Sequence, residues 1–167
     1  QAEAYHNRGT AYEALGQSQR AIQDYDEAIR LNSGFADAYN NRGNSYKNLG
    51  QSQRAIQDFD QAIRLKPGYA EAYNNRGVAY KILGQTQRAL QDYDEAIRLN
   101  SRLAQAYINR GNGYESLGQY QRAIQDYDEA VRLNPKFALP YGGRGIARLH
   151  LARDAEAESD LKKAFEL

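Results

Sequence analysis

A repeat of 34 residues runs through the whole chain and constrains its fold more than any other feature. The dipeptide Arg-Gly returns at this spacing five times, beginning at Arg8, Arg42, Arg76, Arg110 and Arg144. Two further series keep the same step, one of tyrosine from Tyr5 to Tyr141 and one of alanine from Ala21 to Ala157. A fixed period of this length is typical of stacked supersecondary units, so we expect an array in which each unit contacts only its neighbours.

The repeat divides the chain into four full units and a shorter fifth one. They span residues 2–35, 36–69, 70–103, 104–137 and 138–167. Because no linker separates them, we expect a single repeat domain over residues 1–167. In the fifth unit Arg148 replaces a recurring tyrosine and Ala152 replaces a recurring glycine, which indicates a truncated or capping unit.

Each unit is predicted to form two helices. In the second unit the first helix is expected over about residues 36–49, with Gly50 at its end, where glycine readily adopts a left-handed conformation. The second helix is expected over about residues 53–65, before Pro67. Its apolar residues fall at helical spacing and predict one buried stripe, formed by Ala55, Ile56, Phe59, Ala62 and Ile63.

This pattern resembles the tetratricopeptide repeat family, whose period is also 34 residues. The second unit carries the family's residues at Tyr39, Gly43, Tyr46, Ala55, Phe59, Ala62 and Pro67. The resemblance covers essentially the whole chain and implies an all-α, right-handed superhelical solenoid of antiparallel helix pairs. The chain departs from the family in having tyrosine instead of tryptophan at the fourth position of each unit, and arginine instead of leucine at the seventh.

Composition and missing motifs argue against several functions. The 22 Lys and Arg nearly balance the 21 Asp and Glu, which removes the main electrostatic reason to expect a nucleic-acid partner. The chain has no cysteine, no phosphate-loop motif and no apolar run long enough for a membrane span. His6 and His150 lie in the first and last units, so they cannot meet in an array, and we expect them singly at the surface. We therefore expect no catalytic residue, no metal site and no cofactor, and the sequence does not predict a compartment.

An arginine and an aspartate recur together in every unit, sixteen residues apart. The arginine occupies the helix face that should pack against its neighbours, where an unpaired charge is costly. We interpret the two residues as a structural pair that joins the helices of one unit; the alternative is a row of arginines for an anionic ligand. The pairs of the full units are Arg8 with Asp24, Arg42 with Asp58, Arg76 with Asp92 and Arg110 with Asp126.

The remaining aromatic and charged residues have structural interpretations. Most of the 14 tyrosines fall at the fourth, eleventh and twenty-fourth positions of a unit, and we expect them in the core. The second helices carry charges of alternating sign, which predict a solvated outer face with short-range pairs. In the first unit these charges are Arg20, Asp26, Glu27 and Arg30.

Asparagine recurs at the sixth position of the full units, at Asn7, Asn41, Asn75 and Asn109. A row of carboxamides can hold the backbone of an extended peptide, because each offers donors and acceptors. The family resemblance places the row in a concave groove, similar to the asparagine ladder in the repeat domain of O-linked N-acetylglucosamine transferase. Neighbouring groove residues would be Asn40, Asn74, Asn44, Asn112, Lys47, Lys81, Glu71 and Ile108. The alternative is that recent duplication copied a neutral residue.

We therefore expect a non-catalytic protein–protein interaction scaffold that binds a peptide or a partner segment in this groove. A structural array that associates with itself end to end is the first alternative, and a nucleic-acid-binding helical repeat is a less favoured one. The family's carboxylate clamp needs Lys or Arg near the second, fifth and sixth positions of a unit. No such residue occurs there, which argues against an adaptor for acidic chaperone tails.

Overall fold

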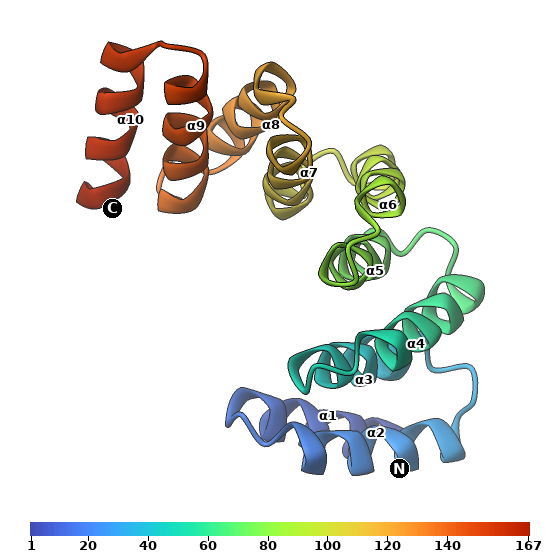
Figure 1. Cartoon of the computed structure of the whole chain (residues 1–167). Coiled ribbons are helices and arrows are strands. Elements are labelled where there is room, and N and C mark those ends of the chain that lie inside the picture. The colour runs from blue at the N-terminus through green and yellow to red at the C-terminus, as the bar shows by residue number, and fades with distance from the viewer. The chain divides into compact units, whose positions relative to one another are not determined.

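The structure, a computed structural model, describes residues 1–167 and contains ten α-helices and no strand (Figure 1). The helices are α1 (Ala2–Ala14), α2 (Ser18–Leu31), α3 (Ala36–Asn48), α4 (Ser52–Leu65), α5 (Ala70–Ile82), α6 (Thr86–Leu99), α7 (Ala104–Ser116), α8 (Tyr120–Leu133), α9 (Ala138–His150) and α10 (Asp154–Glu166). Each of the five repeats thus forms two helices, which confirms the predicted all-α repeat fold.

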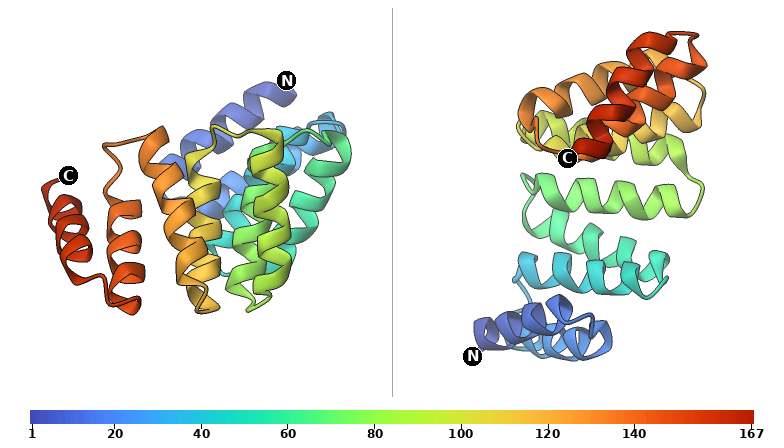
Figure 2. Two further views of the ribbon diagram at one scale, coloured as in Figure 1. Left: turned by 90° about the horizontal axis from the view of Figure 1, so that it is seen from above. Right: turned by 90° about the vertical axis from the view of Figure 1, so that its left-hand side faces the viewer.

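The chain divides into two compact units, Gln1–Arg88 and Ala89–Leu167. The first unit holds α1 to α5 and the first turn of α6, and the second holds the rest of α6 and α7 to α10. Within each unit the two helices of a repeat run antiparallel, and the next pair packs beside them (Figure 2). The single continuous domain expected from the sequence stays a prediction.

A left-handed residue ends the turn between the two helices of every repeat. Gly16, Gly50, Gly84 and Gly118 have φ between +69° and +74°. At Gly50 the backbone N–H donates to the Lys47 carbonyl, and the next N–H donates to the Tyr46 carbonyl, so the last carbonyls of α3 are satisfied. In the fifth repeat Ala152 adopts φ +54° at this place although it carries a Cβ atom.

The second helix of each repeat buries one apolar stripe against the first helix. In α4 this stripe is Ala55, Ile56, Phe59 and Ala62, whereas Ile63, which the helical spacing also predicts to be buried, is only partly buried. A Cβ atom at Gly43 of α3 would come within 2.7 Å of the Phe59 ring. The recurring glycine of the first helix is therefore required by the aromatic ring of the second.

The tyrosines fall into two groups that differ in burial. Tyr25, Tyr93 and Tyr127 of the second helices are essentially buried, as predicted. The tyrosines of the first helices are mostly only partly buried, and among them Tyr46 and Tyr80 pack against the edge of the buried cluster around Phe59. The reason is the recurring arginine: the Arg42 guanidinium lies 5.4 Å from the ring centroid of Tyr39 and 6.0 Å from that of Tyr46. These rings hold a cation over their faces and stay at the edge of the core.

Candidate functional site

The recurring arginine and aspartate connect the two helices of a repeat. Arg42 Nε donates to Asp58 Oδ2 at 2.8 Å, and Arg42 Nη2 donates to Asp58 Oδ1 at 2.7 Å. This bidentate geometry fits the planar guanidinium to the carboxylate. It recurs in Arg8 with Asp24, Arg110 with Asp126 and Arg144 with Asp160. The predicted partnership of Arg76 with Asp92 spans the two compact units and stays a prediction.

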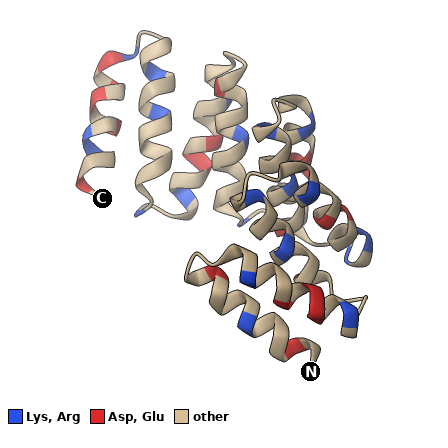
Figure 3. Ribbon diagram, turned by 60° about the horizontal axis from the view of Figure 1, so that its bottom comes forward, with Lys and Arg blue, Asp and Glu red and all other residues tan.

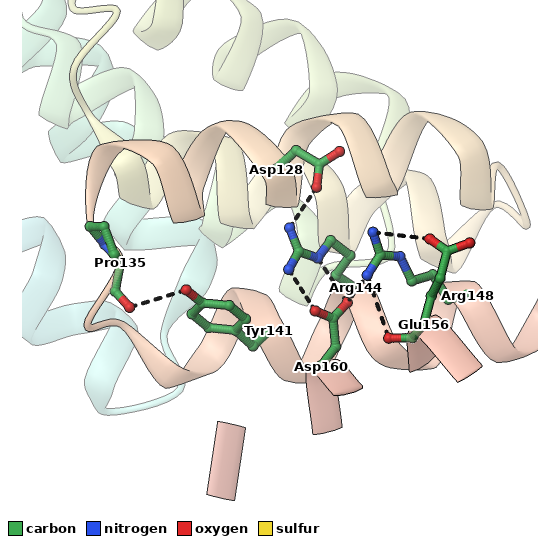
Figure 4. Close-up of polar contacts among 7 residues, drawn as sticks. All are labelled: Asp128, Pro135, Tyr141, Arg144, Arg148, Glu156 and Asp160. Atoms are coloured by element: carbon green, nitrogen blue, oxygen red, sulfur yellow. Dashed lines mark hydrogen bonds and ion pairs between the residues drawn. The ribbon is translucent and has the colours of Figure 1, made fainter. Parts of the chain in front are cut away.

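The same guanidinium also reaches back to the preceding repeat. Arg42 Nη1 donates to Asp26 Oδ1 at 2.6 Å, so Arg42 bridges two repeats and two carboxylates. As predicted for the outer face, Glu27 and Arg30 form a short-range pair and Asp26 is exposed, but the ion pair of Asp26 reaches the following repeat. The bridge recurs in Arg76 with Asp60, Arg110 with Asp94 and Arg144 with Asp128, the last drawn in Figure 4.

The carboxylates hold the arginine as a charged structural element. Burial lowers the pKa of Arg42, but the hydrogen bonds and charges of Asp58 and Asp26 raise the pKa by more, and the net direction is upward. Nε, Nη1 and Nη2 of Arg42 each donate to a carboxylate oxygen. A row of arginines engaged in this way is poorly suited to bind an external anion, which weakens that alternative.

The asparagines of the first unit form a chain of side-chain hydrogen bonds across the first helices α1, α3 and α5. Asn41 Nδ2 lies 2.9 Å from His6 Nε2. Asn40 Nδ2 donates to Asn41 Oδ1 at 3.2 Å, and Asn75 Nδ2 donates to Asn40 Oδ1 at 3.0 Å. The amides of successive repeats therefore bind one another. A carboxamide has two donor hydrogens and two acceptor lone pairs, so Asn41 keeps one of each for a ligand.

Burial separates the predicted groove residues into two sets. Asn40, Asn74 and Ile108, at the fifth position of their repeats, are buried. Their assignment as ligand contacts stays a prediction; in the first unit the side-chain oxygen of Asn40 accepts a hydrogen bond from Asn75 of the next repeat. Asn7 and Glu71 are exposed. The remaining predicted residues are partly buried: Asn41, Asn75, Asn109, Asn44, Asn112, Lys47 and Lys81.

A second polar link in the first unit was not predicted from the sequence. The Glu13 carboxylate of α1 accepts hydrogen bonds from Ser45 at 2.5 Å and from Asn48 at 2.7 Å, both on α3. Nearby, Lys47 Nζ donates to Asn44 Oδ1 at 3.1 Å, and burial lowers the pKa of Lys47 while the charge of Glu13 opposes this shift. These bonds pre-position the polar side chains beside Asn41.

The second unit combines two of the asparagines predicted for the groove with an apolar hollow. The Tyr127 hydroxyl lies 2.7 Å from Asn112 Oδ1 and 2.8 Å from Glu115 Oε2. Gln105 Nε2 donates to Asn109 Oδ1 at 3.1 Å. Beside them lies a hollow of about 720 Å³, lined mainly by apolar residues, which are Phe137, Ala138, Leu139, Gly142, Gly143, Ile146 and Ala164, with Asn112 and Glu115 at its edge. The sequence signal for it is the change to apolar residues at the groove positions of the fifth repeat.

The structure contains no cluster of His, Cys, Asp or Glu that fits a metal ion. None of its helices combines the length and the apolar character that crossing a bilayer requires. The His150 ring stacks on Tyr120 with a centroid distance of 4.2 Å. His6 is partly buried beside Phe35, at 4.8 Å, so the prediction of a surface residue is wrong for this histidine.

Solved structures similar to this chain are repeat proteins. A crystal structure of MamA is 28% identical over 95% of this chain and 92% of that chain, with a TM-score of 0.82. The structure "MamA 41-end from Desulfovibrio magneticus RS-1" is 23% identical over 99% and 94% of the two chains, with a TM-score of 0.85. YrrB, described as "a TPR protein with an unusual peptide-binding site", is 23% identical over 99% and 86%, with a TM-score of 0.75.

The family comparison is more specific than these likenesses. No curated protein sequence matches the chain. The family profile described as "Tetratricopeptide repeat" matches residues 2–35, 36–69, 70–103 and 104–137, which are the ranges of the four full repeats. Four successive matches cover most of the sequence, and the chain belongs to the tetratricopeptide repeat family.

Proposed function

We propose that this protein is a non-catalytic scaffold that holds an extended peptide segment of a partner protein along its recurring asparagines. In the first unit these asparagines form a surface that we call the asparagine face, made of Asn7, Asn41, Asn44 and Asn75. Proteins of this repeat family generally serve as scaffolds for protein–protein interaction, and the similar protein YrrB is described as having a peptide-binding site.

The observation that carries the proposal is the hydrogen-bonding state of Asn41. Its amide is fixed by His6 on one side and by Asn40 on the other, and it still has one free donor and one free acceptor. A peptide backbone offers the complementary carbonyl and N–H. Because the amide is already oriented, binding costs little side-chain entropy.

Charge supports a polypeptide partner over a nucleic acid. Basic and acidic segments are interspersed along the helices (Figure 3). The arginines at the seventh position of the repeats are paired with aspartates, so they do not form a free basic stripe. Nucleic-acid affinity depends on such a stripe.

The test compares wild-type protein with the triple variant Asn41→Ala, Asn75→Ala, Asn109→Ala as baits in a pull-down read by mass spectrometry. The matched control is the exposed amide change Gln57→Ala on α4. We expect the wild type and the control to capture the same polypeptides and the triple variant to lose them. In a titration with the captured segment, each lost hydrogen bond should cost about 1 kcal/mol of binding free energy.

Two results strengthen or overturn the proposal. Methylation of backbone nitrogens in the bound peptide should weaken binding, because it removes backbone hydrogen-bond donors. Exchange of the peptide's side chains should change the affinity less. Equal affinity of the wild type and the triple variant, with equal helix content, would show that the recurring asparagines do not hold the ligand.

A further inference from the structure

The hydrogen-bond chain of the asparagine face ends on a titratable ring. Asn75 donates to Asn40 at 3.0 Å, and Asn40 donates to Asn41 at 3.2 Å. Asn41 Nδ2 lies 2.9 Å from His6 Nε2. Because a side-chain NH2 group can only donate, Nε2 of His6 accepts this bond, and the neutral ring carries its proton on Nδ1. All three bonds therefore donate toward His6, and the chain needs an acceptor at that end.

His6 is the one member of this chain whose hydrogen-bonding character a change of pH can reverse. The counterparts of His6 in the next two repeats are Asn40 and Asn74, whose amides do not titrate. The His6 ring is partly buried, with ring centroids 4.8 Å from Phe35 and 5.8 Å from Tyr25. This packing fixes the ring against Asn41, so the ring meets protonation in place.

A protonated imidazole donates from both of its nitrogens. Nε2–H would then face the Asn41 NH2 group at 2.9 Å, and two donors would meet. Turning the Asn41 amide over brings Oδ1 to His6, but it also brings Nδ2 against Asn40 Nδ2. Asn40 and then Asn75 must turn over in the same way. The turn exchanges an oxygen and a nitrogen of similar size, and the three amides form no other side-chain hydrogen bond that opposes it.

We propose that His6 makes peptide binding on the asparagine face depend on pH, with the neutral ring favouring the bound state and the protonated ring releasing the peptide. When the amides turn over, the free donor and the free acceptor of Asn41 exchange places. A peptide seated on the first pattern then meets N–H with N–H and carbonyl with carbonyl. This inference rests on the proposed function and adds the regulation of the same site.

Asn44 prevents the peptide from recovering the match by sliding along the face. Its Oδ1 accepts from Lys47 Nζ at 3.1 Å, and its side chain lies outside the chain that ends at His6. Asn44 therefore keeps its orientation when Asn41 turns over. A peptide backbone that fits both asparagines in one state cannot fit both in the other.

Other ionisable groups lie near His6 and require a control. Glu3 and Glu13 share its side of α1, three and seven residues away, and Asp37 lies one turn before Asn41 on α3. On α2 the neighbouring group is Tyr25, whose pKa burial raises, so it stays protonated in the acidic range. The variant His6→Asn keeps all four groups and removes only the imidazole. Asparagine is also the residue that the next two repeats have at this position.

The sign of the effect follows from which state binds the peptide. Histidine side chains ordinarily titrate between about pH 5 and pH 8. The affinity for a peptide should therefore fall as the pH falls through this range. Because linkage is reciprocal, a bound peptide should in turn make His6 harder to protonate.

The first experiment uses the whole chain without any peptide. Nitrogen-15 NMR identifies the protonated ring nitrogen of His6 and follows the side-chain NH2 signals of the asparagines through a pH titration. We expect the neutral ring to carry its proton on Nδ1, and the signals of Asn40, Asn41 and Asn75 to shift with the same midpoint as the ring. A neutral ring protonated on Nε2, or amide signals that do not follow the ring, would overturn the inference.

The second experiment adds a capped peptide composed of alanine, serine and threonine, which has no titratable group. Its binding is followed by the same amide signals at pH 7.5 and pH 5.5. We expect the wild type to bind at least about tenfold more weakly at the lower pH, because two hydrogen bonds at Asn41 are lost. His6→Asn should bind equally at both pH values. His150→Asn is the matched control and should keep the pH dependence, because His150 stacks on Tyr120 in the other compact unit.

The outcomes separate this inference from the proposed function. A wild type that binds the peptide equally at both pH values, or a pH dependence that His6→Asn retains, would overturn the regulation and leave the asparagine face as a peptide site. A wild type that does not bind the peptide at either pH would overturn the proposed function, and the regulation with it.

Discussion

At the scale of single residues, the buried aromatic position of the second helix shows how a hydroxyl group can stabilise or destabilise the same fold. Tyr127 places its hydroxyl beside Asn112 and Glu115. The Tyr93 hydroxyl is buried without a hydrogen-bond partner, and the second repeat has Phe59 at this position. A buried polar group without a partner costs free energy because it has left water.

Tyr93→Phe should therefore raise the free energy of unfolding by about 1 kcal/mol, whereas Tyr127→Phe should lower it by a similar amount. Urea unfolding followed by circular dichroism measures both changes. Both substitutions remove the same hydroxyl group. If the free energy of unfolding changes in opposite directions, the difference comes from the hydrogen-bond partners that only the Tyr127 hydroxyl has. Two changes of the same sign would contradict this account.

The arginine–aspartate pair allows a double-mutant test. Arg42→Leu leaves Asp58 buried without its partner, and breaking such a pair costs about 3–5 kcal/mol. Adding Asp58→Leu should recover much of this loss, because both charges are then gone. Arg8→Leu is the control: Arg8 is 59% exposed and Arg42 is 18% exposed, so the control should cost clearly less. Additive losses in the double mutant would mean that the two residues do not interact.

The pairing within a repeat was predictable because both residues return together at a fixed spacing, whereas the bridge to Asp26 was not predicted. Aspartate also recurs at the position of Asp26, but Asp26 and Arg42 belong to different repeats. Whether these two side chains meet depends on how neighbouring helix pairs pack. The burial of Asn40 was missed for the same reason. The periodicity indicates which positions are equivalent, and the crossing of two helices decides which of them face each other.

At the scale of elements, the helices themselves were largely predictable. In the second repeat, α3 and α4 end at Asn48 and Leu65, within one residue of the sequence-based bounds. The signals are local: an apolar stripe with helical spacing and a glycine for the left-handed turn. The apolar hollow beside α9 was not predicted, because Gly142 and Ile146 line it only when α7, α9 and α10 are packed together.

The turn of the fifth repeat gives a prediction at this scale. Ala152 has φ +54°, a conformation that costs an L-residue roughly 1–2 kcal/mol. Ala152→Gly should remove this cost and raise the free energy of unfolding by about 1 kcal/mol, after the greater entropy of unfolded glycine is subtracted. The reverse change, Gly118→Ala, should lower the free energy of unfolding by about the same amount. Thermal unfolding that is unchanged in both variants would contradict the prediction.

At the scale of the whole molecule, the buried tyrosines predict how stability depends on alkaline pH. Burial, first among the causes, raises the pKa of Tyr25, Tyr93 and Tyr127 above the ordinary value. In the unfolded chain these phenols ionise near pH 10. Above that pH the unfolded state loses protons that the folded state keeps, so the stabilisation is complete below about pH 10 and is lost as the pH rises.

Unfolding free energies measured in urea at pH 8 and pH 11 should therefore differ, by up to about 1.4 kcal/mol for each such tyrosine. Because lysines titrate in the same range, the informative quantity is the difference between the wild type and Tyr25→Phe at each pH. This difference should shrink as the pH rises. A difference that is constant between pH 8 and pH 11 would show that Tyr25 ionises equally in both states.

The bridging arginines have a consequence for how such a chain changes its length over evolutionary time. Each inner junction uses the same residues, an aspartate from one repeat and an arginine from the next. Recombination that removes residues 36–69 brings Arg76 opposite Asp26 and restores an ordinary junction. Duplication of an inner block also creates only junctions of the existing kind. The fifth repeat has Lys162 in place of this aspartate, so exchange of repeats among the first four keeps every junction of the same kind.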